Sequence, residues 1–219
     1  MADPKSFFLS PEIHDYLVAH GTPPDAVQAD LIAATAALGG ISMMQIAPEQ
    51  GAFMTMLTEV LGVGLAVEVG TFTGYSALCI ARGLRPGGQL ICCDVSEEWT
   101  ALARPAWEAA GVADRIDLRI APAIETLRSL PADPVIDLAF VDADKPSYAA
   151  YFEELLPRLR PGGLILVDNV LWSGEVINDA TTDENTRALR DFNDLVAQDQ
   201  RVSVVMLPLG DGLSLIRKR

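Results

Sequence analysis

Two groups of polar residues in the second half of the chain have the types and spacing of a metal site. One follows the apolar run at residues 136–141, and the other follows the apolar run at residues 164–167. Their members are Asp142, Asp144, Lys145, Asp168 and Asn169. If the two runs are neighbouring parallel strands, these side chains reach the same edge of a sheet, where open α/β proteins bind ligands.

The donor atoms at this edge would all be oxygens. Asp142 and Asp168 would repel each other unless one is protonated or a cation lies between them, and Asn169 adds a neutral oxygen. Such a set suits a hard divalent cation, namely Mg²⁺, Mn²⁺ or Ca²⁺. Lys145, beside that cation, could serve as a general base. Two plainer interpretations stay open: Asp168 could cap a helix, and Asp144 could form a solvated pair with Lys145.

The stretch at residues 66–76, A-V-E-V-G-T-F-T-G-Y-S, has the pattern of a strand, a glycine-bearing turn and a helix. It predicts the first βα turn of a doubly wound α/β domain. A dinucleotide-binding turn needs a glycine where this chain has Phe72, which argues against a nicotinamide oxidoreductase. S-adenosylmethionine (SAM) carries adenosine without phosphates and makes no such demand. Asp94, after the next apolar run, could bind both ribose hydroxyls; a tight connection without a ligand is the alternative.

Apolar runs and turn signals predict the elements that must position these residues. Strands are expected at residues 65–69, 89–93, 115–120, 136–141, 164–167, 202–207 and 213–217. Helices are expected at residues 10–20, 24–38, 48–61, 74–84, 97–110, 122–129, 146–158 and 184–198. The P-G-G sequences at residues 86–88 and 161–163 are expected to be turns. Residues 1–62 would form accessory helices before a core at residues 63–219.

The strand runs are nearly continuous in apolar residues, which indicates a parallel sheet buried on both faces. The last two strands are joined by a short loop and form a predicted hairpin, so one strand must be antiparallel. We therefore expect an α/β fold with a mostly parallel sheet.

Length and composition fit one domain of 219 residues, of which 50% are hydrophobic. With 16 basic and 30 acidic residues the net charge is −14, which argues against nucleic-acid binding. We expect a cytoplasmic protein that binds no membrane, because the sequence lacks a long apolar span and a signal-peptide pattern. Cys79, Cys92 and Cys93 are interpreted as buried thiols. With only His14 and His20 available, we expect neither a zinc site nor a Ser-His-Asp triad.

The chain resembles the cation-dependent class I SAM O-methyltransferases, the caffeoyl-CoA and catechol O-methyltransferase family. The matching sequences are V-E-V-G-T-F-T-G-Y-S at 67–76, Asp94, A-P-A at 121–123, F-V-D-A-D-K at 140–145 and V-D-N-V-L-W at 167–172. The resemblance implies a Rossmann-like fold with a seven-stranded sheet that has one antiparallel strand and helices on both faces. It also implies a homodimer.

The resemblance further implies roles for individual residues. The SAM site would comprise Met44, Ile46, Glu68, Gly70, Thr71, Phe72, Ser76, Asp94, Ala123 and Asp142. The metal ligands would be Asp142, Asp168 and Asn169. Lys145 and Asp142 would be catalytic, with Lys145 in contact with the substrate. Trp172 and Ser173 are further candidates for substrate contact, and a core or lid role is the alternative for Trp172.

Two departures from the plant members of this family bear on the substrate. Those members carry T-S-x-D-E-G where this chain has I-A-P-E-Q-G at residues 46–51, so Ile46 would contribute only through its backbone. They carry W-N-G where this chain has Trp172, Ser173 and Gly174, which argues against caffeoyl-CoA itself.

These observations lead to the hypothesis of a metal-dependent enzyme that methylates one hydroxyl of a small catechol-like phenol, with Lys145 accepting the proton. Two alternatives remain. One is O-methylation of a hydroxyuridine in tRNA, which the acidic charge of the chain disfavours. The other is a non-catalytic SAM-binding protein, which would need neither the metal ligands nor the lysine.

Overall fold

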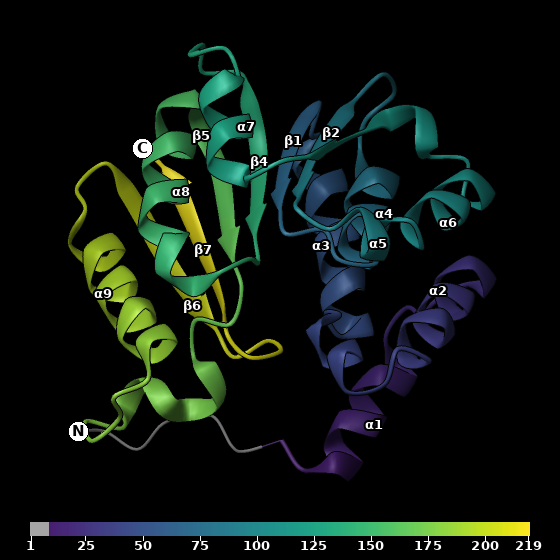
Figure 1. Ribbon diagram of the computed structural model, residues 1–219, viewed down its shortest axis with the longest axis horizontal. Coiled ribbons are helices and arrows are strands. Elements are labelled where there is room, and N and C mark those ends of the chain that lie inside the picture. The colour runs from purple at the N-terminus through teal and green to yellow at the C-terminus, as the bar shows by residue number, and fades with distance from the viewer. Residues whose placement is uncertain (1–8) are drawn as a thin grey trace.

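The computed structural model describes residues 9–219 (Figure 1). In this range seven strands form one sheet, in the order β3-β2-β1-β4-β5-β7-β6. The strands are β1 (Leu65–Val69), β2 (Gln89–Asp94), β3 (Ile116–Ile120), β4 (Ile136–Val141), β5 (Leu159–Val167), β6 (Val202–Leu207) and β7 (Leu213–Lys218). Strands β1 to β5 are parallel, whereas β7 is antiparallel to both of its neighbours. The predicted Rossmann-like α/β fold is confirmed.

Helices lie on both faces of this sheet, as predicted. The α-helices of the described chain are α1 (Pro11–His20), α2 (Ala26–Ala36), α3 (Pro48–Leu61), α4 (Tyr75–Gly83), α5 (Glu97–Thr100), α6 (Ala103–Ala109), α7 (Ala123–Ser129), α8 (Tyr148–Arg158) and α9 (Glu184–Gln198). Short 3₁₀ segments are η1 (Gly39–Met44), η2 (Ala113–Arg115), η3 (Lys145–Ser147) and η4 (Trp172–Ile177). Figure 1 shows α7, α8 and α9 on one side of the molecule and α3, α4 and α6 on the other.

The accessory segment expected at residues 1–62 contains α1, α2 and α3, and its residues 1–8 lie outside the described part of the chain. Figure 1 places α1 at the lower edge of the molecule, away from the sheet. Across residues 9–219, none of the helices combines the length and the apolar character that crossing a bilayer requires.

Side-chain alternation along the strands builds one apolar core on each face of the sheet. In β1, Val67 and Val69 pack with residues of α7, α8 and α9, whereas Ala66 packs with residues of α3, α4 and α6. In β4, Ala139 and Phe140 are divided between the two cores in the same way. Because both of their faces are buried, the central strands β1 and β4 are apolar at nearly every position.

The strand register brings the carboxyl ends of three central strands to one level. Val69 of β1 pairs with Val141 of β4, which in turn pairs with Val167 of β5. The pairing continues past the strands. The amide of Asp142 donates to the carbonyl oxygen of Val69 at 2.8 Å, and that of Asp168 donates to the carbonyl of Val141 at 3.0 Å. Asp142 and Asp168 therefore follow adjacent strands at one edge of the sheet.

Two predicted elements are wrong in detail. The P-G-G sequence at residues 161–163 is not a turn but lies inside β5, where the pairing with β4 shifts register between Ile136 and Leu138. Gly162 has a φ of +77° there, which favours glycine. The helix predicted at residues 97–110 is split into α5 and α6. Pro105 lacks an amide hydrogen and its ring would clash with the carbonyl of Ala101, which favours a break between α5 and α6.

Candidate active site

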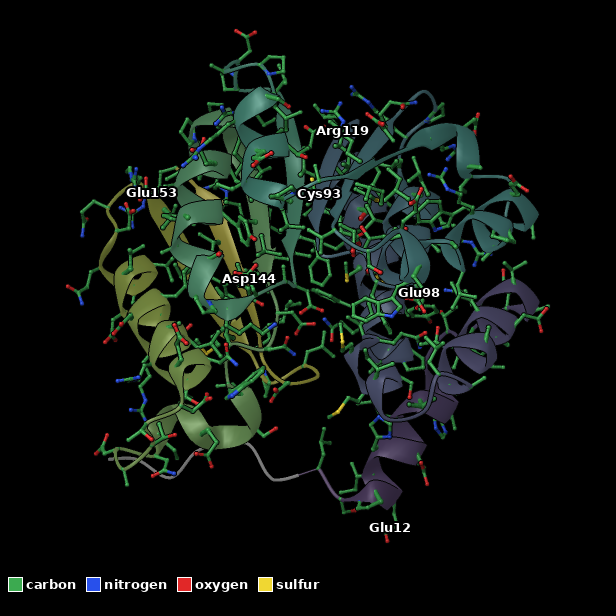
Figure 2. The ribbon with its side chains drawn as sticks, viewed as in Figure 1. Glu12, Cys93, Glu98, Arg119, Asp144 and Glu153 are labelled. Atoms are coloured by element: carbon green, nitrogen blue, oxygen red, sulfur yellow. The ribbon has the colours of Figure 1, made fainter. Side chains whose placement is uncertain are left out.

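A cavity of about 910 Å³ opens at the carboxyl ends of the central strands. Every predicted site residue except Glu68 lies on its wall. These residues are Met44, Ile46, Gly70, Thr71, Phe72, Ser76, Asp94, Ala123, Asp142, Lys145, Asp168, Asn169, Trp172 and Ser173. Two further wall residues, Cys93 and Asp144, are labelled in Figure 2, where both lie toward the middle of the molecule. The predicted residues thus come together, although the role of each stays a prediction.

The turn after β1 requires glycine at its first position. Gly70 has a φ of +90°, and a side chain at this position would collide with the backbone carbonyl of Asp142. Only glycine lets the turn pass this close to the end of β4. The turn and the acidic cluster are therefore in direct contact, and a ligand held by one lies next to the other.

Asp94 fastens the same turn from the end of β2. Its Oδ2 accepts hydrogen bonds from the amides of Thr71 at 2.9 Å and Phe72 at 2.8 Å, and its Oδ1 accepts one from Ser96 at 2.7 Å. These bonds hold Phe72 at a φ of +49°, an uncommon conformation for a residue other than glycine. Each carboxylate oxygen has two lone pairs and Oδ2 already uses both, so Oδ1 of Asp94 can accept one further bond from a ligand in the cavity.

An aromatic pair stands beside this turn. The rings of Phe72 and Trp99 meet edge to face, with their centroids 5.4 Å apart, and both residues line the cavity. Sequence reasoning missed Trp99. The only signal for it is its position five residues after Asp94, at the start of the helix that follows β2.

Glu68 is the predicted site residue that the structure places behind the cavity wall. Its side chain has no exposed surface, and neither carboxylate oxygen has a hydrogen-bond partner in the described chain. Burial raises the pKa of Glu68 to about 7. Glu68 therefore lies behind the glycine turn as a carboxyl group that is costly to ionise.

Lys145 lies at the centre of the acidic cluster. Its Nζ donates hydrogen bonds to Oδ1 of Asp142 at 3.1 Å, to Oδ1 of Asn169 at 2.6 Å and to the hydroxyl of Tyr148 at 2.8 Å. The residue is 7% exposed. The plainer interpretation of Lys145 as part of a solvated pair with Asp144 is therefore wrong. Tyr148 was missed by sequence reasoning, although its position three residues after Lys145 on a helical path is the signal for contact.

Asp168 is buried beside the charge of Asp142. Its Oδ2 accepts a hydrogen bond from Nε2 of Gln50 at 2.8 Å, and its Oδ1 accepts one from the amide of Asn169 at 2.7 Å. Burial, together with the negative charge of Asp142, raises the pKa of Asp168 to about 7. Burial also raises the pKa of Asp142, an effect that the ammonium group of Lys145 opposes. Two carboxylates are thus held where ionising both is unfavourable.

The donor set fits a hard divalent cation. Within residues 9–219 there is no cluster of three His, Cys, Asp or Glu side chains that could hold a metal ion. The predicted set instead combines the carboxylates of Asp142 and Asp168 with the amide oxygen of Asn169, and all of these are the oxygen ligands that Mg²⁺ and Ca²⁺ prefer. The repulsion between the two buried carboxylates is what a cation would relieve.

The loop after β5 has an unusual backbone. Asn169, Trp172 and Ser173 have φ values of +57°, +47° and +51°, which are uncommon for residues other than glycine. The β6–β7 turn supports this loop, because the backbone of Leu171 and the amide of Ser173 both donate hydrogen bonds to Asp211. As a result the Trp172 ring faces Lys145, with 5.6 Å between its centroid and Nζ.

Known proteins resemble this chain along most of its length. The sequence profile of the O-methyltransferase family matches residues 21–219. The catechol O-methyltransferase domain-containing protein 1 of Mus musculus is 42% identical over 182 residues, which cover 82% of this chain and 69% of that protein. Caffeoyl-CoA O-methyltransferase 2 of Zea mays is 40% identical over 187 residues, which cover 81% of this chain and 71% of that protein.

Solved structures agree with these relatives. The O-methyltransferase of Bacillus cereus, in complex with S-adenosylhomocysteine (SAH), superposes with a TM-score of 0.86 at 32% identity and covers 95% of this chain and 97% of its own. An SAH-bound methyltransferase of Podospora anserina superposes with a TM-score of 0.87 at 27% identity and covers 99% of each chain. The chain therefore belongs to the O-methyltransferase family, and the prediction of a SAM-dependent O-methyltransferase is confirmed.

Proposed function

We propose that this enzyme transfers the methyl group of SAM to one hydroxyl of a small catechol-like acceptor, and that it requires a divalent cation. One observation carries the proposal. Lys145 and the oxygens of Asp142, Asp168 and Asn169 converge on the wall of the cavity that begins at the Gly70 turn. A protein that only bound SAM would need neither a buried lysine nor this set of oxygens.

The glycine turn and Asp94 would form the SAM end of the cavity. Thr71 and Phe72 are held by Oδ2 of Asp94, and the remaining lone pair on its Oδ1 suits a hydroxyl of a ribose. The aromatic pair of Phe72 and Trp99 offers an apolar surface for the adenine ring. The SAH bound in the relatives from Bacillus cereus and Podospora anserina supports this assignment.

Asp142, Asp168 and Asn169 would hold the cation. When bound, a divalent cation supplies positive charge that orients a vicinal diol and lowers the pKa of its hydroxyls. Mg²⁺ suits these donors, and Mn²⁺ and Ca²⁺ are the other candidates.

The remaining steps belong to the residues of the chain. Lys145 would accept the proton of the acceptor hydroxyl at Nζ as the neutral amine, after its ammonium group has released one proton to solvent. An aromatic acceptor that reaches Nζ also meets the ring of Trp172. Trp172 and Ser173 would hold that ring from the strained loop after β5. Holding the hydroxyl in line with the methyl group of SAM is itself a large part of the rate gain in such a transfer.

We also propose that the enzyme is a cytoplasmic homodimer. The family resemblance supports a dimer, and so does the exposure of large apolar side chains on two accessory helices. These are Tyr16 on α1 and Met56 and Val60 on α3. Sedimentation equilibrium of the purified chain would detect the dimer, and a monomer at micromolar concentration would contradict this part of the proposal.

The proposed function is tested by methyl transfer from labelled SAM to matched pairs of phenols. Caffeic acid, with two vicinal hydroxyls, is compared with p-coumaric acid, which has one. Each is assayed with Mg²⁺, with EDTA, and with EDTA followed by excess Mg²⁺. We expect methylation of caffeic acid alone, its loss with EDTA, and its recovery with Mg²⁺.

Two outcomes would contradict the proposal. Equal methylation of both phenols, unaffected by EDTA, would exclude the chelated diol and the cation. Methylation of tRNA but of no phenol would favour the hydroxyuridine alternative. The Asp168→Asn variant is the matched control for the cation site. Asparagine keeps the shape of this proposed cation-binding side chain and removes its charge.

A further inference from the structure

All three ammonium hydrogens of Lys145 are used by neighbouring acceptors, and those acceptors differ in kind. Asp142 and Asn169 line the cavity and are proposed cation ligands. The third acceptor, the hydroxyl of Tyr148, belongs to a side chain that is 1% exposed and does not line the cavity. Tyr148 therefore touches the lysine from behind, where neither substrate nor cation reaches.

The hydroxyl of Tyr148 is itself fixed by a second hydrogen bond. It donates to the backbone carbonyl of Asp168 at 3.1 Å. A phenol hydroxyl has one hydrogen, so using it on this carbonyl leaves its lone pairs for Nζ of Lys145. The carbonyl belongs to the residue whose amide continues the β4–β5 pairing, so it is anchored to the sheet.

Packing fixes the ring of Tyr148 as well. It meets the ring of Phe192 on α9 edge to face, with centroids 5.7 Å apart. Nζ of Lys145 lies 5.0 Å from the centroid of the tyrosine ring, which adds a cation–π contact to the hydrogen bond. The tyrosine thus offers the lysine a site that does not depend on the cavity's contents.

We propose that Tyr148 is the positioning residue of Lys145, which it retains at the cavity wall when other ligands occupy the oxygens of Asp142 and Asn169. The inference rests on the proposed function, because the cation is the ligand that would take those oxygens. Without Tyr148, a lysine has four flexible side-chain bonds and lies beside a like charge, so it would leave the site. With Tyr148, the hydrogen bond from Nζ to the phenol hydroxyl still holds the lysine, and the ring contact only adds to it.

The lysine content of the chain allows a direct test. The sequence has three lysines, Lys5, Lys145 and Lys218, so a sample labelled with ¹³C and ¹⁵N at lysine gives three sets of side-chain NMR signals. The set that the Lys145→Arg variant lacks belongs to Lys145. Lys218 is an internal reference, because its Nζ donates to the carbonyls of Leu156 and Leu159, at the opposite end of α8 from Tyr148. Signals are recorded with and without Mg²⁺.

The test variant is Tyr148→Phe, which keeps the ring against Phe192 and removes only the hydroxyl. In the wild type we expect Mg²⁺ to change the chemical shifts of Lys145. The side chain should remain immobile, without averaged shifts. In the variant with Mg²⁺ we expect the averaged shifts of a mobile lysine, with the Lys218 signals unchanged. We expect kcat to fall roughly 10- to 100-fold while KM for SAM changes less than about twofold.

Tyr16→Phe is the matched control, since it removes the same hydroxyl from an exposed position on α1. Lys145 signals in Tyr148→Phe that match the wild type with and without Mg²⁺ would overturn the inference. The wild type alone gives a second test if the variant misfolds, because a Lys145 that becomes mobile when Mg²⁺ binds also overturns it.

Failure of the proposed function would look different. If Mg²⁺ shifts none of the Lys145 signals in the wild type, the proposed cation site is contradicted. The inference is then judged without Mg²⁺. The variant removes one of the three acceptors of Lys145, so the Lys145 shifts must change relative to both the wild type and Tyr16→Phe.

Discussion

Nε2 of Gln50 lies 2.8 Å from Oδ2 of Asp168, and this hydrogen bond joins α3 to the end of β5. Gln50 is 1% exposed and Asp168 is 3% exposed. The β6–β7 turn closes over the same amide, because a side chain at Gly210 would meet Oε1 of Gln50. The accessory helix α3 is therefore part of the site, and it orients a proposed cation ligand.

Replacing Gln50 by leucine should destabilise the protein. Asp168 would keep its burial and its neighbour Asp142 but lose a donor, which costs about 1–3 kcal/mol of unfolding free energy. Urea unfolding at neutral pH measures the change. Gln89→Leu, an exposed position on β2, is the matched control. If Gln50→Leu loses no more unfolding free energy than Gln89→Leu, the hydrogen bond between Gln50 and Asp168 contributes nothing to stability.

The sheet, and the position of the two aspartates at its edge, could be predicted from the sequence because the signals for both are local. Each central strand is apolar on both faces, and Asp142 and Asp168 directly follow two such strands. Rules of α/β topology then place the ends of neighbouring parallel strands together. The hairpin of β6 and β7 was predictable for the same reason, since its turn residues lie between its strands.

The partners of those residues could not be predicted, because they come from distant parts of the chain. Gln50 is 118 residues before Asp168, and nothing in its own helix indicates the contact. The bulge at residues 161–163 was missed because P-G-G fits a turn equally well, and only the pairing with β4 decides between them. The burial of Glu68 behind the turn likewise depends on how α4 packs on β1.

Lys145→Met should remove most of the turnover and little of the SAM binding. Methionine preserves the length of the side chain but cannot accept a proton, so we expect kcat to fall by about 10²- to 10⁴-fold. Calorimetric titration with SAM measures the dissociation constant of the same variant, which should stay within a few-fold of the wild type. Equal losses of turnover and of SAM affinity would contradict the role of Lys145 as base.

Glu68 predicts a pH dependence of stability. The ordinary pKa of a glutamate is 4.5, and burial raises that of Glu68 to about 7 in the folded protein. Between these values the folded state holds a proton that the unfolded state releases. The contribution of Glu68 is therefore fully present below pH 4.5 and is lost as the pH rises to 7. The loss is about 3 kcal/mol by linkage.

The Glu68→Gln variant isolates this effect, since its amide does not titrate. Measured by urea unfolding, the variant should gain stability relative to the wild type as the pH rises from 4.5 to 7, and the difference should be constant above 7. Glu98→Gln, at an exposed position on α5 (Figure 2), is the control for losing a carboxylate. A difference between Glu68→Gln and wild type that does not vary with pH would contradict the raised pKa.

Gly70→Ala should impair both folding and SAM binding, and a second glycine separates the two causes. Gly70 and Gly87 have φ values of +90° and +75°, so alanine is strained at both positions, by about 1–2 kcal/mol. Gly87 has open space around it, whereas a side chain at Gly70 collides with the carbonyl of Asp142. We expect Gly70→Ala to lose at least about 2 kcal/mol more unfolding free energy than Gly87→Ala, because the turn must move away from β4.

Only Gly70→Ala should weaken SAM binding, by roughly tenfold or more, since a 1 Å displacement of positioning groups has effects of that size. If both variants bind SAM as the wild type does, the approach of the turn to Asp142 has no part in holding the ligand.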